Sequence, residues 1–167
     1  MDDMISLPEP QRRLITARRE YLDALELLLA RVKRELRIFD PDLAELDFNS
    51  PPRIEALRRI LSTGRMHRIH IALHDVEHVS TRCPRLIDLL RIFPGELVIY
   101  RTEGEAARAQ DRFVLVDEID VVRRPVARQA RGVLVLDDPH EAHVMRLRFE
   151  EIWESSVPGV SATTSGL

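Results

Sequence analysis

Apolar residues recur along this chain mostly at helical spacing, separated by short runs with strand-like patterns. From about Gln11 to Arg34 they return every three or four positions with Arg and Glu between them, which predicts one long amphipathic helix. Pro51-Pro52 and Gly64 bracket a second such segment, and Pro and Gly favour these helix ends. Asp138 is a plausible N-cap for the last one. The predicted helices span about 11–34, 51–64, 84–93 and 139–154.

Shorter apolar runs between these segments predict strands. Residues 68–74 alternate between apolar and other residues, which is typical of a half-buried strand. Residues 113–116 are continuously apolar, as in a central strand covered on both faces. The predicted strands are 36–39, 68–74, 97–100, 113–116, a hairpin partner at 119–123, and 133–136. The alternation indicates an α/β fold with a mixed, mostly parallel sheet flanked by helices on both faces.

The length of 167 residues suits one compact domain. Pro8 and Pro10 indicate a loose N-terminal arm over residues 1–10, and the Ser/Thr/Gly-rich end indicates a flexible tail over 157–167. We therefore expect a single domain over 11–156.

Composition narrows the functional classes. Apolar residues make up 44% and charged residues 32%, and the net charge is −3, so a general polyanion-binding surface is disfavoured and nucleic acid is an unlikely partner. No run approaches the roughly 20 apolar residues of a membrane span, and no signal-peptide pattern opens the chain. Cys83 is the only cysteine, so an intrachain disulfide is impossible, and we expect a packed thiol and a cytoplasmic protein.

The stretch from Gln110 to Asp117 carries the most specific pattern. Its spacing is that of His-x-Lys-x-x-x-x-Asp, with Asp117 in place, Arg112 at the Lys position and Gln110 at the His position. The run between Arg112 and Asp117 reads as a buried strand that ends in an acid.

With its flanking elements, this stretch resembles the phospholipase D superfamily, over roughly residues 12–156. The α/β run of 68–100 before the motif, the hairpin after Asp117 and the closing helix with Phe149 and Trp153 carry the rest of the likeness. The chain also resembles bacterial phospholipase D-like domains, some of which are attached to acetyltransferase-type domains.

The resemblance implies a half-domain. Enzymes of the superfamily bring two motifs together, one His attacking phosphorus and the other protonating the leaving oxygen, so a site here would need a homodimer. Gln110 is neither nucleophile nor base, and Arg123-Arg124 occupies the place of the usual Gly-Ser pair. We expect no phospholipase D catalysis and no cofactor. The resemblance leaves a candidate anion-binding set, with a hydrogen-bonded strand end as the alternative: Gln110, Arg112, Asp117, Arg123 and Arg124.

Other polar residues offer alternatives. Three predicted strands end in the acids Asp40, Asp75 and Asp117, and ligands of open α/β sheets bind beyond the carboxyl ends of the strands. With Asp42 these acids suggest a metal-dependent phosphoesterase. His70, His74 and His78 are four residues apart, but His70 lies in a predicted strand, which argues against a zinc site. Phe149 and Trp153 lie on the inward stripe of the last helix and are expected in the core.

Two functional hypotheses follow. The first is a non-catalytic binding or scaffolding domain, homodimeric, that holds a phosphate-bearing ligand or a protein partner. The second is the metal-dependent phosphoesterase that uses strand-end aspartates.

Overall fold

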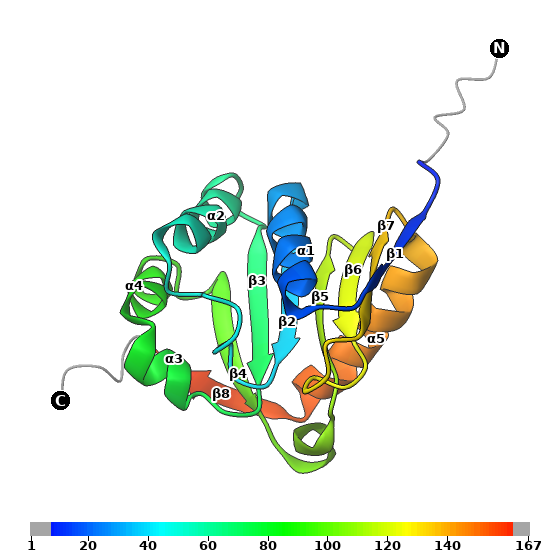
Figure 1. The fold of residues 1–167 in the computed structure, drawn as a ribbon. Coiled ribbons are helices and arrows are strands. Elements are labelled where there is room, and N and C mark those ends of the chain that lie inside the picture. The colour runs from blue at the N-terminus through cyan, green and yellow to red at the C-terminus, as the bar shows by residue number, and fades with distance from the viewer. Residues whose placement is uncertain (1–7, 162–167) are drawn as a thin grey trace.

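The computed structural model describes residues 8–161 and builds them around one eight-stranded sheet. The strand order is β1-β7-β6-β5-β2-β3-β4-β8 (Figure 1). The strands are β1 (Gln11–Ile15), β2 (Glu35–Asp40), β3 (Arg68–Leu73), β4 (Leu97–Thr102), β5 (Arg112–Val116), β6 (Asp120–Arg124), β7 (Gly132–Leu136) and β8 (Ser156–Val160).

Strand direction changes in the middle of the sheet. β2, β3 and β4 run parallel to one another, whereas β5 is antiparallel to β2 and begins an antiparallel run through β6, β7 and β1. The α/β class and the mixed sheet are therefore confirmed. The expectation of a mostly parallel sheet was wrong, because hairpin connections follow β5 and antiparallel edge strands close both sides.

Helices cover both faces of the sheet, as predicted. α1 to α4 lie over one face and α5 over the other (Figure 1). The helices are α1 (Arg18–Arg31), α2 (Pro51–Ser62), α3 (Glu77–Arg82), α4 (Pro84–Ile92) and α5 (Pro139–Glu154), with a short 3₁₀ helix, η1 (Gly104–Arg108).

Alternation along the strands divides the core into two layers. On β5, Val114 packs toward α1, while Phe113 and Leu115 pack toward α5. Every residue of β5 is buried, as expected for a central strand covered on both sides. On α5, Phe149 is buried, as predicted, whereas Trp153 is only partly buried and stacks on Phe149 at the border of the core.

The first helix begins later than its pattern predicted. Gln11–Ile15 form the edge strand β1, paired with β7, and Leu14, counted as a helix position, is 76% exposed while Ile15 is buried. The carboxylate of Glu20 accepts hydrogen bonds from the backbone N–H groups of Thr16 and Ala17 and so closes the start of α1. With this cap, helical structure begins seven residues later than apolar spacing alone predicted.

The predicted C-terminal tail also begins with a strand. Ser156–Val160 pair with the free edge of β4 as β8, with a register shift near Ile99. Pro158 is compatible with this place because an edge strand leaves one side unpaired. The remainder of that predicted tail and most of the predicted N-terminal arm lie outside the described residues.

The directions of the strands decide which strand ends lie beside one another. The carboxyl end of β2 lies beside the first residues of β5, since Phe39 pairs with Phe113. The carboxyl end of β5 lies at the opposite edge, where Val116 pairs with Leu36 near the start of β2. Within residues 8–161, no helix is both long and apolar enough to cross a bilayer.

Gly132 begins β7 where the backbone of β6 passes closely. A Cβ atom at this position would lie 2.4 Å from the carbonyl oxygen of Arg123. We predict that Gly132→Ala lowers the free energy of unfolding by about 1–3 kcal/mol, because backbone must shift to admit the methyl group. Gly95→Ala is the matched control, since no atom lies within 4 Å of its Cβ position. Equal urea denaturation midpoints for the two variants would contradict this account of the β6–β7 contact.

Candidate functional site

Arg112 is a buried arginine at the start of the central strand. It points toward the α1 side of β5, and only 2% of its side chain is exposed. Its Nη2 lies 2.6 Å from Oδ1 of Asp40, and its Nη1 lies 2.7 Å from Oε2 of Glu45. Both charged ends of the guanidinium therefore face carboxylates of the same chain.

Asp40 ends β2 and is fully buried. Its second carboxylate oxygen accepts hydrogen bonds from the backbone N–H groups of Asp42, at 3.2 Å, and Leu43, at 2.7 Å. Asp40 thus turns the chain out of the sheet and into the loop 41–50. Leu43 has a left-handed backbone conformation, with φ of 66°, and is itself buried.

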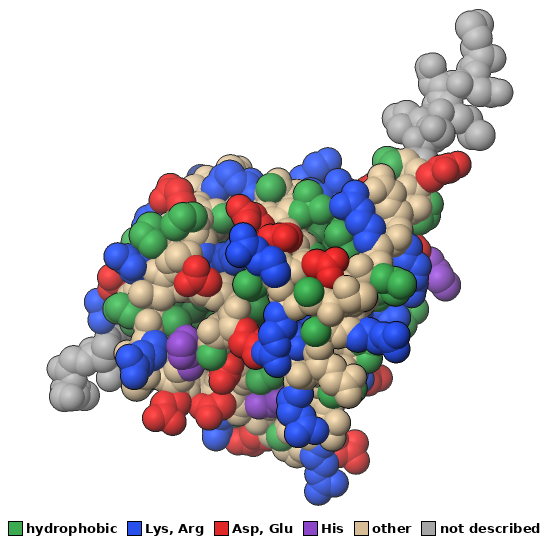
Figure 2. Space-filling model, in the orientation of Figure 1, with side chains coloured by type: hydrophobic (Ala, Val, Ile, Leu, Met, Phe, Trp, Pro, Cys, Tyr) green, Lys and Arg blue, Asp and Glu red, His purple; other side chains and the backbone are tan. Residues whose placement is uncertain are grey.

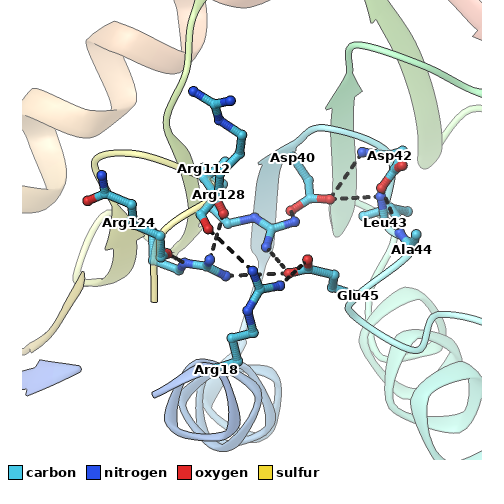
Figure 3. Close-up of polar contacts among 11 residues, drawn as sticks. Arg18, Asp40, Asp42, Leu43, Ala44, Glu45, Arg112, Arg124 and Arg128 are labelled. Carbon is cyan, nitrogen blue, oxygen red and sulfur yellow. Dashed lines mark hydrogen bonds and ion pairs between the residues drawn. The ribbon is translucent and has the colours of Figure 1, made fainter. Parts of the chain in front are cut away.

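Glu45, in this loop, is the point where several arginines converge (Figure 3). Its carboxylate contacts Arg18 from the first turn of α1, Arg112 from β5, and Arg124 from the end of β6, the last at 3.5 Å. The Glu45 side chain is 45% exposed, whereas Arg112 and Arg124 are buried. We call Arg18, Asp40, Glu45, Arg112 and Arg124 the arginine cluster.

The β6–β7 connection and α1 complete the surroundings of the cluster. Arg124 donates hydrogen bonds to the carbonyl oxygens of Ala127, at 2.6 Å, and Gln129. Tyr21 of α1 lies against both buried guanidiniums, whose Cζ atoms are 5.7 Å (Arg112) and 5.4 Å (Arg124) from its ring centroid.

The charges of the cluster shift the proton affinities of its members. Burial lowers the pKa of Arg112, but the charge of Asp40 and the hydrogen bond to Glu45 outweigh it, so the pKa of Arg112 is raised. Burial opposes the ionised form of Glu45, yet its hydrogen bonds to Arg112 and Arg18 lower its pKa overall. Burial and the charge of Asp40 raise the pKa of Tyr21. Burial raises the pKa of Asp40, and the charge of Arg112 opposes this shift. The shifts of Arg112 and Glu45 therefore favour their charged forms, and the shift of Tyr21 favours the neutral phenol.

The predicted anion-binding residues are only partly brought together. Arg112 and Arg124 share the cluster, and Gln110 is exposed nearby, its carbonyl accepting from the N–H of Ala127 at 2.6 Å. Arg123 points to the opposite face of the sheet, where it pairs with Glu141 of α5 at 3.2 Å.

Asp117 follows the carboxyl end of β5, whereas the cluster lies at the other end of this strand. Its carboxylate accepts hydrogen bonds from the backbone N–H groups of Lys33, Arg34 and Glu35, at 2.7–2.9 Å. The expected crevice shared by Asp40, Asp75 and Asp117 was therefore wrong, because β5 runs antiparallel to β2. A pocket of about 710 Å³ opens beside Asp117.

Several charged residues of that larger pocket already have partners in the same chain. Arg31 pairs with Asp120 and Asp137, each at 2.8 Å, and Asp117 is satisfied by three amides. The size of this pocket does not by itself indicate a ligand or a reaction, so the arginine cluster remains the stronger candidate site.

The aspartates of the metal-dependent phosphoesterase hypothesis do not converge on one site. Asp42 accepts from the N–H of Ala44, Asp75 accepts from the N–H of Glu77, and Asp40 faces Arg112. In the part of the chain that the structure describes, no group of three or more His, Cys, Asp or Glu residues could hold a metal ion.

The histidines lie in separate surroundings. His70 stacks on Trp153 at a centroid distance of 4.8 Å. His74 lies within hydrogen-bonding distance of the Thr102 hydroxyl, at 2.6 Å, and of the Ala109 carbonyl, at 2.8 Å. Cys83 is buried at the start of α4, as expected, and burial raises its pKa.

Three members of the site had no sequence signal that we used. Arg18 and Tyr21 belong to the apolar-periodic segment of α1, where an arginine reads as a solvated residue. Glu45 lies in an irregular loop, 67 positions before its partner Arg112. The succession of acids in Asp40-Pro41-Asp42 marked this loop, but for metal binding rather than for pairing with arginine.

One face of the molecule carries charges of both signs. Figure 2 shows Lys and Arg side chains interspersed with Asp and Glu side chains on that face, without a broad region of one sign. This distribution agrees with the net charge of −3.

Comparison with known proteins places the chain in a described family. The family of the domain of unknown function DUF7931 matches residues 17–162. No curated protein matches the chain.

Solved structures with the same fold include proteins of the phospholipase D family. Nuc from Salmonella typhimurium, a phospholipase D family member, has a TM-score of 0.59 and 16% identity, over 92% of this chain and 100% of Nuc. Phosphatidylserine synthase from Haemophilus influenzae has a TM-score of 0.59 and 16% identity, over 100% of this chain and 44% of the synthase. TrmBL2, an archaeal chromatin protein that binds DNA, has a TM-score of 0.64 and 13% identity, over 95% of this chain. This chain spans only 57% of TrmBL2. The fold is phospholipase D-like, as the sequence resemblance implied.

Removing the arginine at the centre of the cluster should destabilise the fold. We predict that Arg112→Met lowers the free energy of unfolding by about 3–5 kcal/mol, because the charge of buried Asp40 loses its partner. Arg101→Met is the matched control: its pair with Glu103 is exposed, so we expect a change within about 0.5 kcal/mol. Urea denaturation followed by circular dichroism measures both, and a stable Arg112→Met variant would refute this role.

Proposed function

The chain belongs to the DUF7931 family, and from that premise we propose that it is a non-catalytic phospholipase D-like binding domain that works as a homodimer. The observation that carries this proposal is the state of the motif positions. Gln110 has an amide where the superfamily pattern has an attacking imidazole, and Arg112 has both ends of its guanidinium engaged by Asp40 and Glu45.

Phosphoryl transfer requires a nucleophile and cations that are free to hold the phosphoryl oxygens. A carboxamide does not attack phosphorus at ordinary pH, and it cannot donate a proton to the leaving oxygen as an imidazolium does. Arg112 is already paired with Asp40 and Glu45. A histidine at position 110 would therefore still lack a free cation to hold the phosphoryl oxygens. The arrangement favours binding over hydrolysis.

Homodimerisation is supported by the resemblance, in which two motifs face each other, and by the exposed Gln110 end of β5. The match covers 100% of Nuc and 44% of phosphatidylserine synthase, so a domain of this size is the whole of one relative and part of another. β5 itself lies in the middle of the sheet, so the motif strand has no free edge with which a second chain could pair. The twofold contact proposed here lies at the Gln110 end of β5, where Gln110 and Arg108, the last residue of η1, are exposed.

The ligand of this module is best sought among small anions and protein partners. Two buried arginines of the cluster, Arg112 and Arg124, supply positive charge at the strand ends. TrmBL2 binds DNA, but the net charge of −3 and the mixed surface charges of this chain do not support a nucleic-acid function here.

Catalysis is tested with a chromogenic phosphodiester, bis(p-nitrophenyl) phosphate. We predict background hydrolysis by the purified protein, with EDTA or with Mg²⁺ or Mn²⁺, and by the Gln110→His variant, because Arg112 remains paired in that variant. A known phosphodiesterase serves as the positive control. Turnover that is lost in Asp40→Ala, or a phosphorylated residue found by mass spectrometry, would overturn the non-catalytic proposal.

Assembly is tested by sedimentation velocity at micromolar concentration. We predict a species of twice the 19.3 kDa chain mass. Gln110→Arg should shift it toward monomer, because two added charges would face each other across the twofold contact. Ile119→Arg, at the opposite edge of the sheet, is the matched control and should leave the dimer intact. A monomeric parent protein, or equal behaviour of the two variants, would count against this interface.

A further inference from the structure

A small pocket opens beside the arginine cluster. It has a volume of about 240 Å³, and its lining combines charged, aromatic and aliphatic side chains: Arg18, Tyr21, Leu22, Glu45, Leu46 and Arg124. The charged residues of the lining belong to the cluster, whereas the leucines belong to α1 and to the loop 41–50.

Glu45 already shows what kind of group these arginines bind. Its carboxylate contacts Arg18, Arg112 and Arg124, which are the contacts that a free oxyanion would make (Figure 3). Glu45 is also the cluster carboxylate that solvent can reach, since its side chain is 45% exposed whereas Asp40 is fully buried. The Glu45 carboxylate therefore occupies an oxyanion position from the solvent side.

Glu45 can leave this position without unfolding the loop. Leu43 and Leu46, on either side of it, are buried in the core, and the amide of Leu43 is held by Asp40. These contacts anchor the backbone, so a rotation of the Glu45 side chain alone would vacate the arginines.

The cluster and the adjacent Tyr21 also contain buried polar groups without a hydrogen-bond partner within residues 8–161. The Tyr21 hydroxyl and the Arg112 Nε are buried and have no hydrogen-bond partner among the described residues. Three guanidiniums face two carboxylates, which leaves an excess of one positive charge (3 − 2 = +1). In agreement, burial and the charge of Arg112 lower the pKa of Arg124.

We propose that this pocket binds a small organic oxyanion, whose charged group replaces the Glu45 carboxylate at Arg18 and Arg124 while its apolar part lies against Leu22 and Leu46. The inference rests on the proposed binding function and names its ligand class. A carboxylate and a phosphate monoester share the required chemistry. The pocket volume restricts the ligand to a short apolar chain, because drug-sized ligands occupy pockets of roughly 300–1,000 Å³.

The experiment is isothermal titration of the full chain with butyl phosphate, butyrate and inorganic phosphate. We expect butyl phosphate or butyrate to bind at one site per chain, and inorganic phosphate at least about tenfold more weakly than butyl phosphate, because it lacks apolar contact. Which of the two butyl compounds binds more tightly identifies the phosphate or the carboxylate as the preferred head group.

Variants test the two named contacts. Glu45→Gln removes the competing charge and keeps the side-chain size, so it should tighten binding of the preferred butyl compound by about tenfold. Arg18→Ala should weaken binding by about tenfold, since a charged hydrogen bond is lost. Arg19→Ala is the matched control on the same turn of α1, where Arg19 is highly exposed and does not line the pocket. Arg18 is itself exposed, so its replacement leaves the core intact.

Three outcomes would overturn the inference: no binding of either butyl compound to the parent and to Glu45→Gln, equal binding of inorganic phosphate and butyl phosphate, or equal effects of Arg18→Ala and Arg19→Ala. None of these three outcomes would change the hydrolysis and sedimentation results that test the proposed function. Hydrolysis of the phosphodiester would instead remove the proposed function while these titrations could still succeed.

Discussion

The buried pair between Arg112 and Asp40 is the constraint on which this molecule depends. A guanidinium out of water is costly unless its charge and its N–H groups are matched, and here a carboxylate at the end of β2 matches it at 2.6 Å. The pair requires β2 and β5 to lie side by side with opposite directions, because only then does the last residue of one strand meet the first residue of the other. The reversal of direction within the sheet and the place of the loop 41–50 follow from the same contact.

Under the proposed function, the pair also accounts for a phospholipase D-like fold that binds without catalysing. A lysine at the position of Arg112 would present one compact charge that is free to reach a substrate, whereas arginine has a planar fork that carboxylates grip at two sides. Asp40 and Glu45 occupy that fork. Under the proposed function, the arginine at this position holds the protein's own loop and not a substrate. The amide of Gln110, in place of an imidazole, would act in the same direction.

Local patterns predicted most of the fold, and they failed where a distant segment decides the outcome. The helices at 51–62, 84–92 and 139–154 were predicted from apolar spacing and from the prolines that begin them. Two of them have side-chain N-caps: the Ser50 hydroxyl accepts from the N–H of Arg53, and the Asp138 carboxylate accepts from the N–H of Glu141, as predicted. β1 and β8 are edge strands whose only strong partner is another strand, so their own sequences read as helix and tail. In the site, the motif spacing drew attention to Arg112. The sequence did not reveal that β5 runs antiparallel to β2, and this direction places Asp117 at the other end of the strands from Arg112. Glu45 was missed because its role depends on a contact across 67 positions.

Stability and binding are divided between different members of the cluster. The contact of Arg112 with Asp40 is fully buried, so breaking it leaves a charge without water or partner. The contact of Arg18 with Glu45 is more than 40% exposed on both sides, and exposed pairs contribute about 0–1 kcal/mol because water competes for both charges. An incoming anion that replaces Glu45 at Arg18 therefore exchanges a weak contact for an equivalent one, while Asp40 continues to hold Arg112 and the strands together. A site can change its occupant in this way only if its rigid pair and its replaceable pair are separate, and in this protein the two are carried by different carboxylates.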